Sequence, residues 1–227
     1  MSWEHERASI RRDALGIAAY AGAFAVSYGA VAVAAGLSVA QTCTLSLVMF
    51  TGASQVAFVG VIGSGGSALA ALAAAMMLGL RNAFYGVRFT GVLGVHGRRT
   101  VIAAQFVIDE TTAMAVTHDD QRAQRYAFWT TGVLLAIAWN VGTLVGALGG
   151  SAIGDPATFG LDAVVPAAFL ALLWPRLTDH TSRLVAIGGA LVATMLVPFV
   201  PPGIPVLAAA PVAVVAGLLG HSDRRPT

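Results

Sequence analysis

The chain has 227 residues, of which 57% are hydrophobic and only 11% are charged, against about 25% charged in an average soluble domain. No charged residue lies between positions 14 and 80, and two more charge-free stretches cover 126–154 and 184–222. Because a soluble domain needs a polar face on nearly every surface element, this pattern excludes a soluble enzyme, a nucleic-acid-binding module and a disordered chain. It predicts an integral membrane protein built of helices.

The chain is predicted to form one transmembrane domain over 14–220, between a polar segment at 1–13 and a short tail at 221–227 that are both expected in the cytoplasm. A membrane-spanning helix needs about 20 apolar residues, and apolar blocks of about this size follow one another closely. We therefore predict an all-α polytopic membrane protein, a compact bundle of six to eight transmembrane segments. The predicted segments are 14–36, 40–62, 67–93, 100–117, 126–149, 160–175, 184–200 and 204–220.

Two of these segments are predicted to be broken or re-entrant. The second is interrupted by the polar and small residues 50–55, and the fourth carries Asp109 and Glu110 near its middle. If all eight segments cross the membrane, the arginines at 98–99 lie on the opposite face from the other arginine clusters, at 7–12, 122–125, 176–183 and 224–225. If the second and fourth segments dip in and return, all clusters share one face, as the positive-inside rule favours. We prefer this second topology, with six full spans.

Small residues recur every three or four positions in three segments, which predicts close helix–helix packing. A face that slides during transport is the alternative interpretation. The stripes are Ala18, Gly22, Ala25, Gly29, Ala32 and Gly36; Ala71, Ala75 and Gly79; and Gly142, Gly146 and Gly150.

Ionisable residues inside a membrane are costly and indicate function. On helices, Arg81, Tyr85 and Arg88 would share one face. Gln105, Asp109 and Thr112 would share another, with Glu110 pointing about 100° away from Asp109. Facing each other, these groups would line a polar cavity in which an arginine holds a carboxylate and an acid exchanges a proton. A static buried pair, or acids at a segment end near the surface, remain as alternatives.

The second candidate region is the interruption at 50–55, where Phe50, Ser54 and Gln55 would line a broken helix whose ends face a charged substrate group. An ordinary helix crossing point with one buried amide is the alternative. Asn140 is expected to form an interhelical hydrogen bond. No catalytic or nucleotide-binding motif is present, and the histidines all lie between segments or at the termini, so we do not expect an enzyme.

Together these residues resemble the AzlC-type family, the large subunit of branched-chain amino acid exporters. The specific blocks are Phe50-Thr51-Gly52-Ala53-Ser54-Gln55 and Asp109-Glu110-Thr111. Further matches are Ser27-Tyr28-Gly29, Gly36-Leu37-Ser38, Leu80-Arg81-Asn82, Trp139-Asn140-Val141-Gly142-Thr143 and Gly160-Leu161-Asp162. The family usually reads Asn-Leu-Arg-His where this chain reads Gly79-Leu80-Arg81-Asn82, so its substrate specificity is expected to differ from leucine, isoleucine and valine if this region touches substrate.

The resemblance implies efflux of hydrophobic amino acids through a bacterial inner membrane, driven by the proton gradient and without a bound cofactor or metal. It also implies a partner, a small AzlD-type membrane subunit. Arg81 would hold the substrate carboxylate or orient an acid, and Asp109 would carry the proton with Glu110 in reserve. Phe50 to Gln55, Tyr28 and Asn140 would lie along the substrate path. The alternative is a passive channel or a structural subunit for another small solute.

Overall fold

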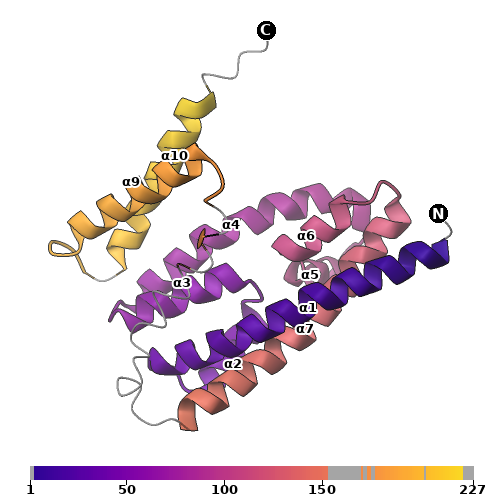
Figure 1. The fold of residues 1–227 in the computed structure, drawn as a ribbon, viewed down its shortest axis with the longest axis horizontal. Helices are drawn as coiled ribbons and strands as arrows, with labels where there is room; N and C mark the ends of the chain where they lie inside the picture. Colours follow the sequence, from indigo (N-terminus) through magenta and orange to yellow (C-terminus); the bar gives the residue numbers. More distant parts are fainter. Residues whose placement is uncertain (1–2, 153–169, 171–172, 175–176, 202, 222–227) are drawn as a thin grey trace.

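Figure 1 shows the computed structural model, which describes residues 3–152, 170, 173–174, 177–201 and 203–221. The regular structure in these residues is α-helical, as predicted. The predicted segment at 160–175 and the tail at 221–227 lie outside the described residues, apart from single positions. The helices are α1 (Trp3–Ala34), α2 (Val39–Val48), α3 (Gly52–Gly63), α4 (Ala68–Leu93), α5 (Arg98–Gln105), α6 (Asp109–Val116), α7 (Gln121–Ala152), α9 (His180–Leu196) and α10 (Ile204–His221).

Among the described residues, three helices are long and apolar enough to cross a membrane, namely α1, α4 and α7. They correspond to the first, third and fifth predicted segments, and the chain is a multi-pass membrane protein. The polar segment predicted at 1–13 is helical from Trp3 and forms the first turns of α1. Its polar first turns therefore continue the first membrane helix beyond its apolar part.

Helices α1 and α7 lie side by side and run in the same direction (Figure 1). At their N-terminal ends, the rings of Trp3 and Tyr126 are 5.7 Å apart. Further along both helices, a Cβ on Gly22 would lie 3.2 Å from Ala138, and a Cβ on Gly150 would lie 3.0 Å from Ala30. The residue numbers of the contacting pairs thus rise together along both helices, so α1 and α7 pack in parallel over most of their length.

Glycine makes this pairing possible. A Cβ on Gly29 would overlap the carbonyl oxygen of Thr143, and a Cβ on Gly142 or Gly146 would overlap the carbonyl of Gly22 or Val26. Close backbone approach is how helices associate where lipid offers no hydrophobic driving force. The small-residue stripes of the first and fifth predicted segments are helix–helix contacts within the chain, except at Gly36, which lies beyond the end of α1 with nothing within 4 Å of its Cβ position.

The second predicted segment is broken, as predicted, and returns to the end at which it starts. Its first helix, α2, has a capping box in which Ser38 accepts from the Gln41 amide at 3.2 Å and Gln41 accepts from the Ser38 amide at 2.8 Å. The chain leaves helix at residues 49–51 and turns back as α3. The last residue of α3, Gly63, lies against Ala35 beyond the end of α1, since a Cβ there would be 3.1 Å from the Ala35 Cβ.

The fourth predicted segment is also broken, and it enters from the opposite end. α5 follows the turn at Gly94, where a Cβ would lie 2.7 Å from the Arg125 guanidinium near the start of α7. The chain leaves helix at residues 106–108 and returns as α6. Just after α6, His118 Nδ1 lies 3.3 Å from a carboxylate oxygen of Glu6 on α1. Both ends of this segment thus lie at the end where α1 and α7 begin.

Helix α4 connects the two broken segments and runs opposite to α1 and α7. Its C-terminal part packs on the first turns of α7, with the rings of Phe89 and Phe128 5.7 Å apart. Its N-terminal half packs on α3 through the buried Ala71 and Ala75, so the third small-residue stripe is also a helix contact. Helices α9 and α10 pair with each other, and α10 touches α4, so this pair lies at the edge of the α1–α7 bundle (Figure 1).

Three of the arginine clusters gather at one end of the molecule, which we call the arginine-rich end. It holds the first turns of α1, the α4–α5 turn and the first turns of α7, and therefore Arg7, Arg98 and Arg122. For these three of the five clusters, the grouping is the one predicted for re-entrant second and fourth segments.

Candidate functional site

The break between α2 and α3 is closed by one buried amide, that of Gln55. Its side chain is fully buried, and its Nε2 donates to the carbonyl oxygens of Ser46, at 3.3 Å, and Met49. Its Oε1 accepts from Trp139 Nε1 on α7 at 2.9 Å. A helix that ends inside a membrane leaves carbonyls that neither water nor the next turn can satisfy. Gln55 pairs the Ser46 carbonyl, adds a second donor to the Met49 carbonyl, which also accepts from the Thr51 amide at 2.7 Å, and ties the break to α7.

A second amide pairs the remaining carbonyls of α2. Gln105, at the end of α5, donates to Leu47 at 2.8 Å and to Val48 at 3.2 Å. The polar groups at the end of α2 are therefore held by one glutamine from each broken segment. Sequence analysis placed Gln105 in a polar cavity, and its observed contacts are backbone carbonyls.

The break between α5 and α6 is closed by Thr111. Its hydroxyl lies 2.5 Å from the Phe106 carbonyl and 3.2 Å from that of Ile108, and it accepts from the Ile108 amide at 3.2 Å. Because the helix stops at residues 106–108, Gln105, Asp109 and Thr112 do not lie on one continuous helix. The predicted shared face of these three residues is therefore wrong.

The two breaks meet in the centre of the bundle. The rings of Phe50 and Phe106 are 6.0 Å apart and nearly perpendicular. Trp139 stacks between Phe24 and Tyr28 of α1, with centroids 6.0 and 5.9 Å away. Phe24 and Trp139 lie near the middle of the apolar stretches of α1 and α7. The half-helices α2 and α3, of 10 and 12 residues, are each about 15–18 Å long, or about half of a hydrocarbon core.

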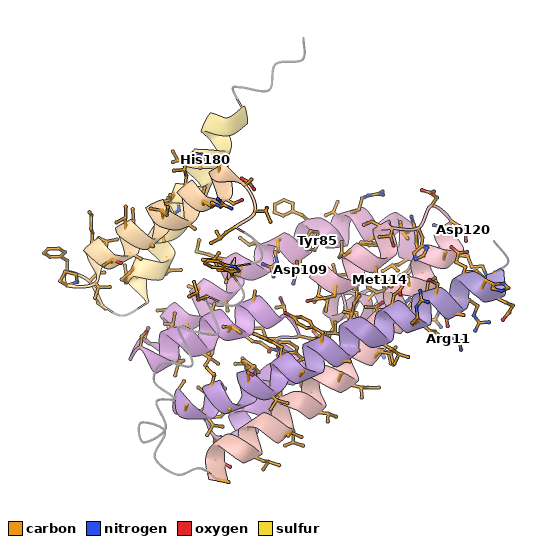
Figure 2. All side chains as sticks on the ribbon, in the orientation of Figure 1. Arg11, Tyr85, Asp109, Met114, Asp120 and His180 are labelled. Carbon is orange, nitrogen blue, oxygen red and sulfur yellow. The ribbon has the colours of Figure 1, made fainter. Side chains whose placement is uncertain are left out.

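Arg81 of α4 and Asp109, the first residue of α6, form the predicted ion pair next to these breaks. Figure 2 shows Asp109 beside α4. Arg81 Nη2 lies 2.9 Å from Asp109 Oδ2, and the two side chains are 26% and 25% exposed. The Nε of Arg81 is buried and has no hydrogen-bond partner among the described residues. Asp109 is thus held by one edge of the guanidinium.

The other predicted charges lie apart from this pair. Arg88 shares a helix face with Arg81 but lies two turns, or about 10 Å, closer to the arginine-rich end. Its side chain is exposed and has no ion pair within the described part of the chain. Glu110 lines a different cavity, of about 490 Å³, with Ile17 and Tyr20 of α1. The expectation that Arg88 faces the membrane acids is wrong, and Glu110 points toward α1.

Several predicted polar residues keep an unpaired atom in the core. The hydroxyl oxygens of Tyr28, Ser54 and Thr112 are buried and lack a partner among the described residues. Asn140 donates to Ala136 of its own helix at 2.8 Å and leaves its Oδ1 unpaired there. Within the described residues, Asn140 does not form the expected interhelical hydrogen bond. Ser54 Oγ lies near Gly79 of α4, where a Cβ would be 3.5 Å away.

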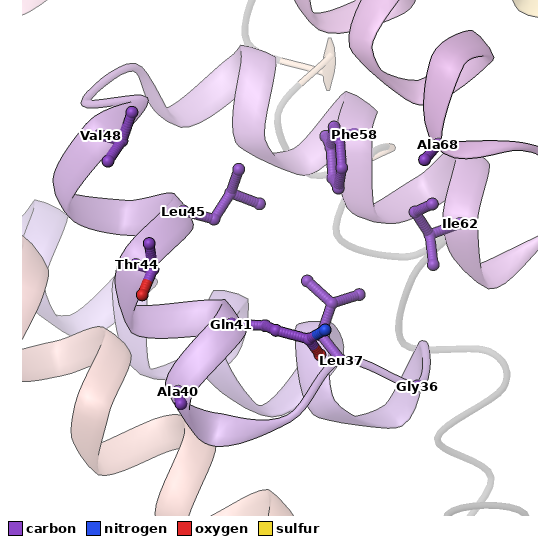
Figure 3. A pocket seen from close by; sticks show the side chains of 10 residues that line it. All are labelled: Gly36, Leu37, Ala40, Gln41, Thr44, Leu45, Val48, Phe58, Ile62 and Ala68. Carbon is purple, nitrogen blue, oxygen red and sulfur yellow. The ribbon is translucent and has the colours of Figure 1, made fainter.

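An apolar cleft leads from the break to the opposite end of the molecule. It has a volume of about 600 Å³ and lies between the two arms of the re-entrant segment (Figure 3). Leu37, Leu45, Phe58 and Ile62 form its apolar wall, and Val48 lines it next to the break. Gln41 and Thr44 also line it.

Sequence reasoning assigned no role to Trp139, Thr111 or the pair Ser46 and Thr143, whose hydroxyls are 3.3 Å apart and link α2 to α7. Their signal was present, since Thr111, Trp139 and Thr143 stand inside the matching motif blocks. The motifs could not predict the hydrogen-bond partner of each side chain, because residues such as Ser46 and Thr143 are far apart in the sequence.

Membrane transporters typically contain helices that are broken near the membrane centre, with charged residues beside the breaks. The fold and the site therefore define a membrane transporter. The family model described as "AzlC protein" matches residues 16–153, more than half of the chain and both breaks. The chain belongs to this transporter-type family. Comparisons with curated proteins and with solved structures gave no match.

Proposed function

We propose that the chain is the large subunit of a proton-coupled exporter of branched-chain or other hydrophobic amino acids. It would act with a small AzlD-type membrane subunit in a bacterial inner membrane. The observation that carries the proposal is the Arg81–Asp109 pair, 2.9 Å apart, beside two helix breaks at the centre of the bundle.

The pair supports coupling because its two members serve two ligands. A substrate carboxylate is the chemical equivalent of the Asp109 side chain, so it competes for the planar donor edge of Arg81. In the proposed cycle Arg81 binds the substrate carboxylate on the way out, and Asp109 carries the proton on the return. The two ligands are carried alternately, as export driven by an inward proton gradient requires.

The first turn of α3 favours a carboxylate. α3 begins at Gly52 without a side-chain cap from Thr51, so its first amides present the positive end of a helix dipole. Ser54, in the same turn, has a buried hydroxyl without a partner among the described residues. The carbonyls at the end of α2 already accept from Gln55 and Gln105. The apolar cleft between α2 and α3 suits a hydrophobic side chain.

The arginine-rich end supports the proposed orientation. Cytoplasmic loops are enriched in arginine, so the N-terminus, the α4–α5 turn and the start of α7 would face the cytoplasm. The cleft between α2 and α3 would then open toward the outside, as an exit path requires.

The decisive experiment measures efflux of leucine, valine and methionine from preloaded cells that express the chain with its partner. Asp109→Asn should abolish efflux while the protein remains in the membrane. Asp119→Asn, an exposed acid after α6, is the matched control and should leave efflux unchanged. Undiminished efflux by Asp109→Asn would refute the proton role. Flux that never saturates and persists without a proton gradient would instead indicate a passive channel.

A further inference from the structure

An open pocket of about 460 Å³ lies at the arginine-rich end, between the first turns of α1 and α7. Three arginines and three aromatic residues line it, and no acidic residue does. The lining residues are Trp3, Arg7, Arg122, Arg125, Tyr126 and Trp129.

Two of the three arginines are held by aromatic rings, and Arg125 donates from Nε to the Val92 carbonyl at 2.6 Å. The guanidinium carbon of Arg122 lies 4.2 Å from the Trp3 ring centre, and that of Arg7 lies 5.1 Å from the Tyr126 ring centre. The nearest acid, Glu4, is 3.8 Å from Arg7 but is 81% exposed. Arg7 Nε is buried and lacks a hydrogen-bond partner among the described residues. Cation–π contacts fix the guanidinium planes while their positive charge stays available to an anion.

The pocket lies at the depth of lipid headgroups. The charge-free stretches of α1 and α7 begin at Ala14 and Tyr126. At 1.5 Å per residue, Arg7 and Arg122 lie about 6–10 Å outside this boundary, which matches the headgroup layer. Tryptophan and tyrosine are also enriched at this level of a membrane.

A second, apolar groove continues from the pocket toward the membrane interior. Its volume is about 510 Å³, and Tyr126 and Trp129 line both cavities. Leu15, Val133 and Leu134 form its deeper wall, and Arg11 adds another guanidinium at its upper rim. No acidic residue lines this groove either. Figure 2 shows Arg11 near the N-terminal end of α1, at the same end of the bundle as Asp120 and the start of α7.

We propose that the arginine pocket and the adjoining groove form a binding site for an anionic phospholipid. Arg7, Arg122 and Arg125 would bind the phosphate, and the groove along Leu15 and Val133 would take the upper part of an acyl chain. Leu15 and Val133 are 55% and 46% exposed, and an acyl chain would cover them. A basic pocket continuous with an apolar groove matches a two-part ligand, charged at one end and apolar at the other.

The test measures thermal unfolding of the purified full chain in uncharged detergent, with added phosphatidylglycerol, phosphatidylcholine, glycerophosphoglycerol or inorganic phosphate. Phosphatidylglycerol should raise the unfolding temperature in a saturable way. Phosphatidylcholine, which is zwitterionic, and the two ligands without acyl chains should have much weaker effects. Equal stabilisation by phosphatidylcholine would overturn the proposal, and so would full stabilisation by phosphate alone.

The variant Arg7→Gln/Arg122→Gln removes two guanidiniums from the pocket, and Arg98→Gln/Arg99→Gln removes two exposed ones from the same end. An arginine near the membrane contributes roughly fivefold in affinity for anionic lipid. The pocket variant should therefore need roughly 25-fold more phosphatidylglycerol for half of the shift, while the control variant should behave as the native chain. An equal loss in both variants would indicate attraction to net charge and refute a defined site. If the pocket variant does not fold, the native chain's ranking of the four ligands still decides.

Discussion

Trp139 Nε1 on α7 donates a 2.9 Å hydrogen bond to Gln55 Oε1, and the same amide donates to the carbonyls of Ser46 and Met49 at the end of α2. One side chain thus joins α2, α3 and α7 at the break, where the backbone inside the membrane lacks its regular helical hydrogen bonds.

Gln55→Glu should destabilise the protein more than Trp139→Phe. The carboxylate keeps an acceptor for Trp139 but loses the N–H donors to Ser46 and Met49, and a buried polar group left unpaired costs about 1–3 kcal/mol. Trp139→Phe leaves only the single Oε1 acceptor unpaired. The unfolding temperatures of both variants in detergent measure the difference. Equal shifts would mean that the Gln55 donors contribute little.

Removing Arg81 should cost more stability than removing Arg88. Arg81→Ala leaves Asp109 without its cation, for which we expect about 2 kcal/mol, below the 3–5 kcal/mol of fully buried pairs, because both side chains stay partly exposed. Arg88→Ala should stay within about 0.5 kcal/mol. Denaturant titration of the two variants and of Arg81→Ala/Asp109→Asn checks this. The double variant should be more stable than Arg81→Ala alone, and the opposite order would contradict a paired carboxylate.

Gly146→Ala should prevent stable packing of α1 on α7. A Cβ at this position would overlap the Val26 carbonyl, so the two backbones must separate. Gly149→Ala is the matched control three residues further on, because its Cβ would meet nothing within 4 Å. It should be neutral or gain up to about 1 kcal/mol from helix propensity. Folded yield and unfolding temperature distinguish them, and a well-folded Gly146→Ala would contradict the parallel pairing.

Thiol labelling should place both ends of each broken segment on one membrane face. In a Cys43→Ser background, Ser38→Cys and Ser64→Cys should react with an impermeant reagent from the same side. His96→Cys and Asp119→Cys should both react from the other side. Eight full spans would put the members of each pair on opposite sides, so a single split pair decides against re-entry.

Polar interruptions in the sequence were sufficient to predict both breaks. An amide or acid in an apolar block is costly in lipid unless it pairs with other polar groups, and a helix break supplies such groups. The Arg81–Asp109 pair was predictable for the same reason, since membrane charges need partners. The side-chain face shared by Gln105, Asp109 and Thr112 was predicted wrongly. Helical periodicity assumes a continuous helix through residues 105–112, whereas the helix is interrupted at 106–108. Contacts such as Gln105 with Leu47 depend on how two half-helices meet, which no local pattern records.

The parallel pairing of α1 with α7 also sets an order of assembly. During synthesis α1 emerges first, and its glycine face has no partner until α7 follows, with both broken segments made in between. Until Trp139 arrives, Gln55 lacks its α7 anchor, and until Gln105 arrives the last carbonyls of α2 have no donor. The closing contacts are therefore among those most distant in sequence, and such contacts form late. A nascent chain that stops before α7 exposes the glycine face of α1 and leaves Gln55 without its Trp139 donor, so we expect membrane quality control to recognise this form.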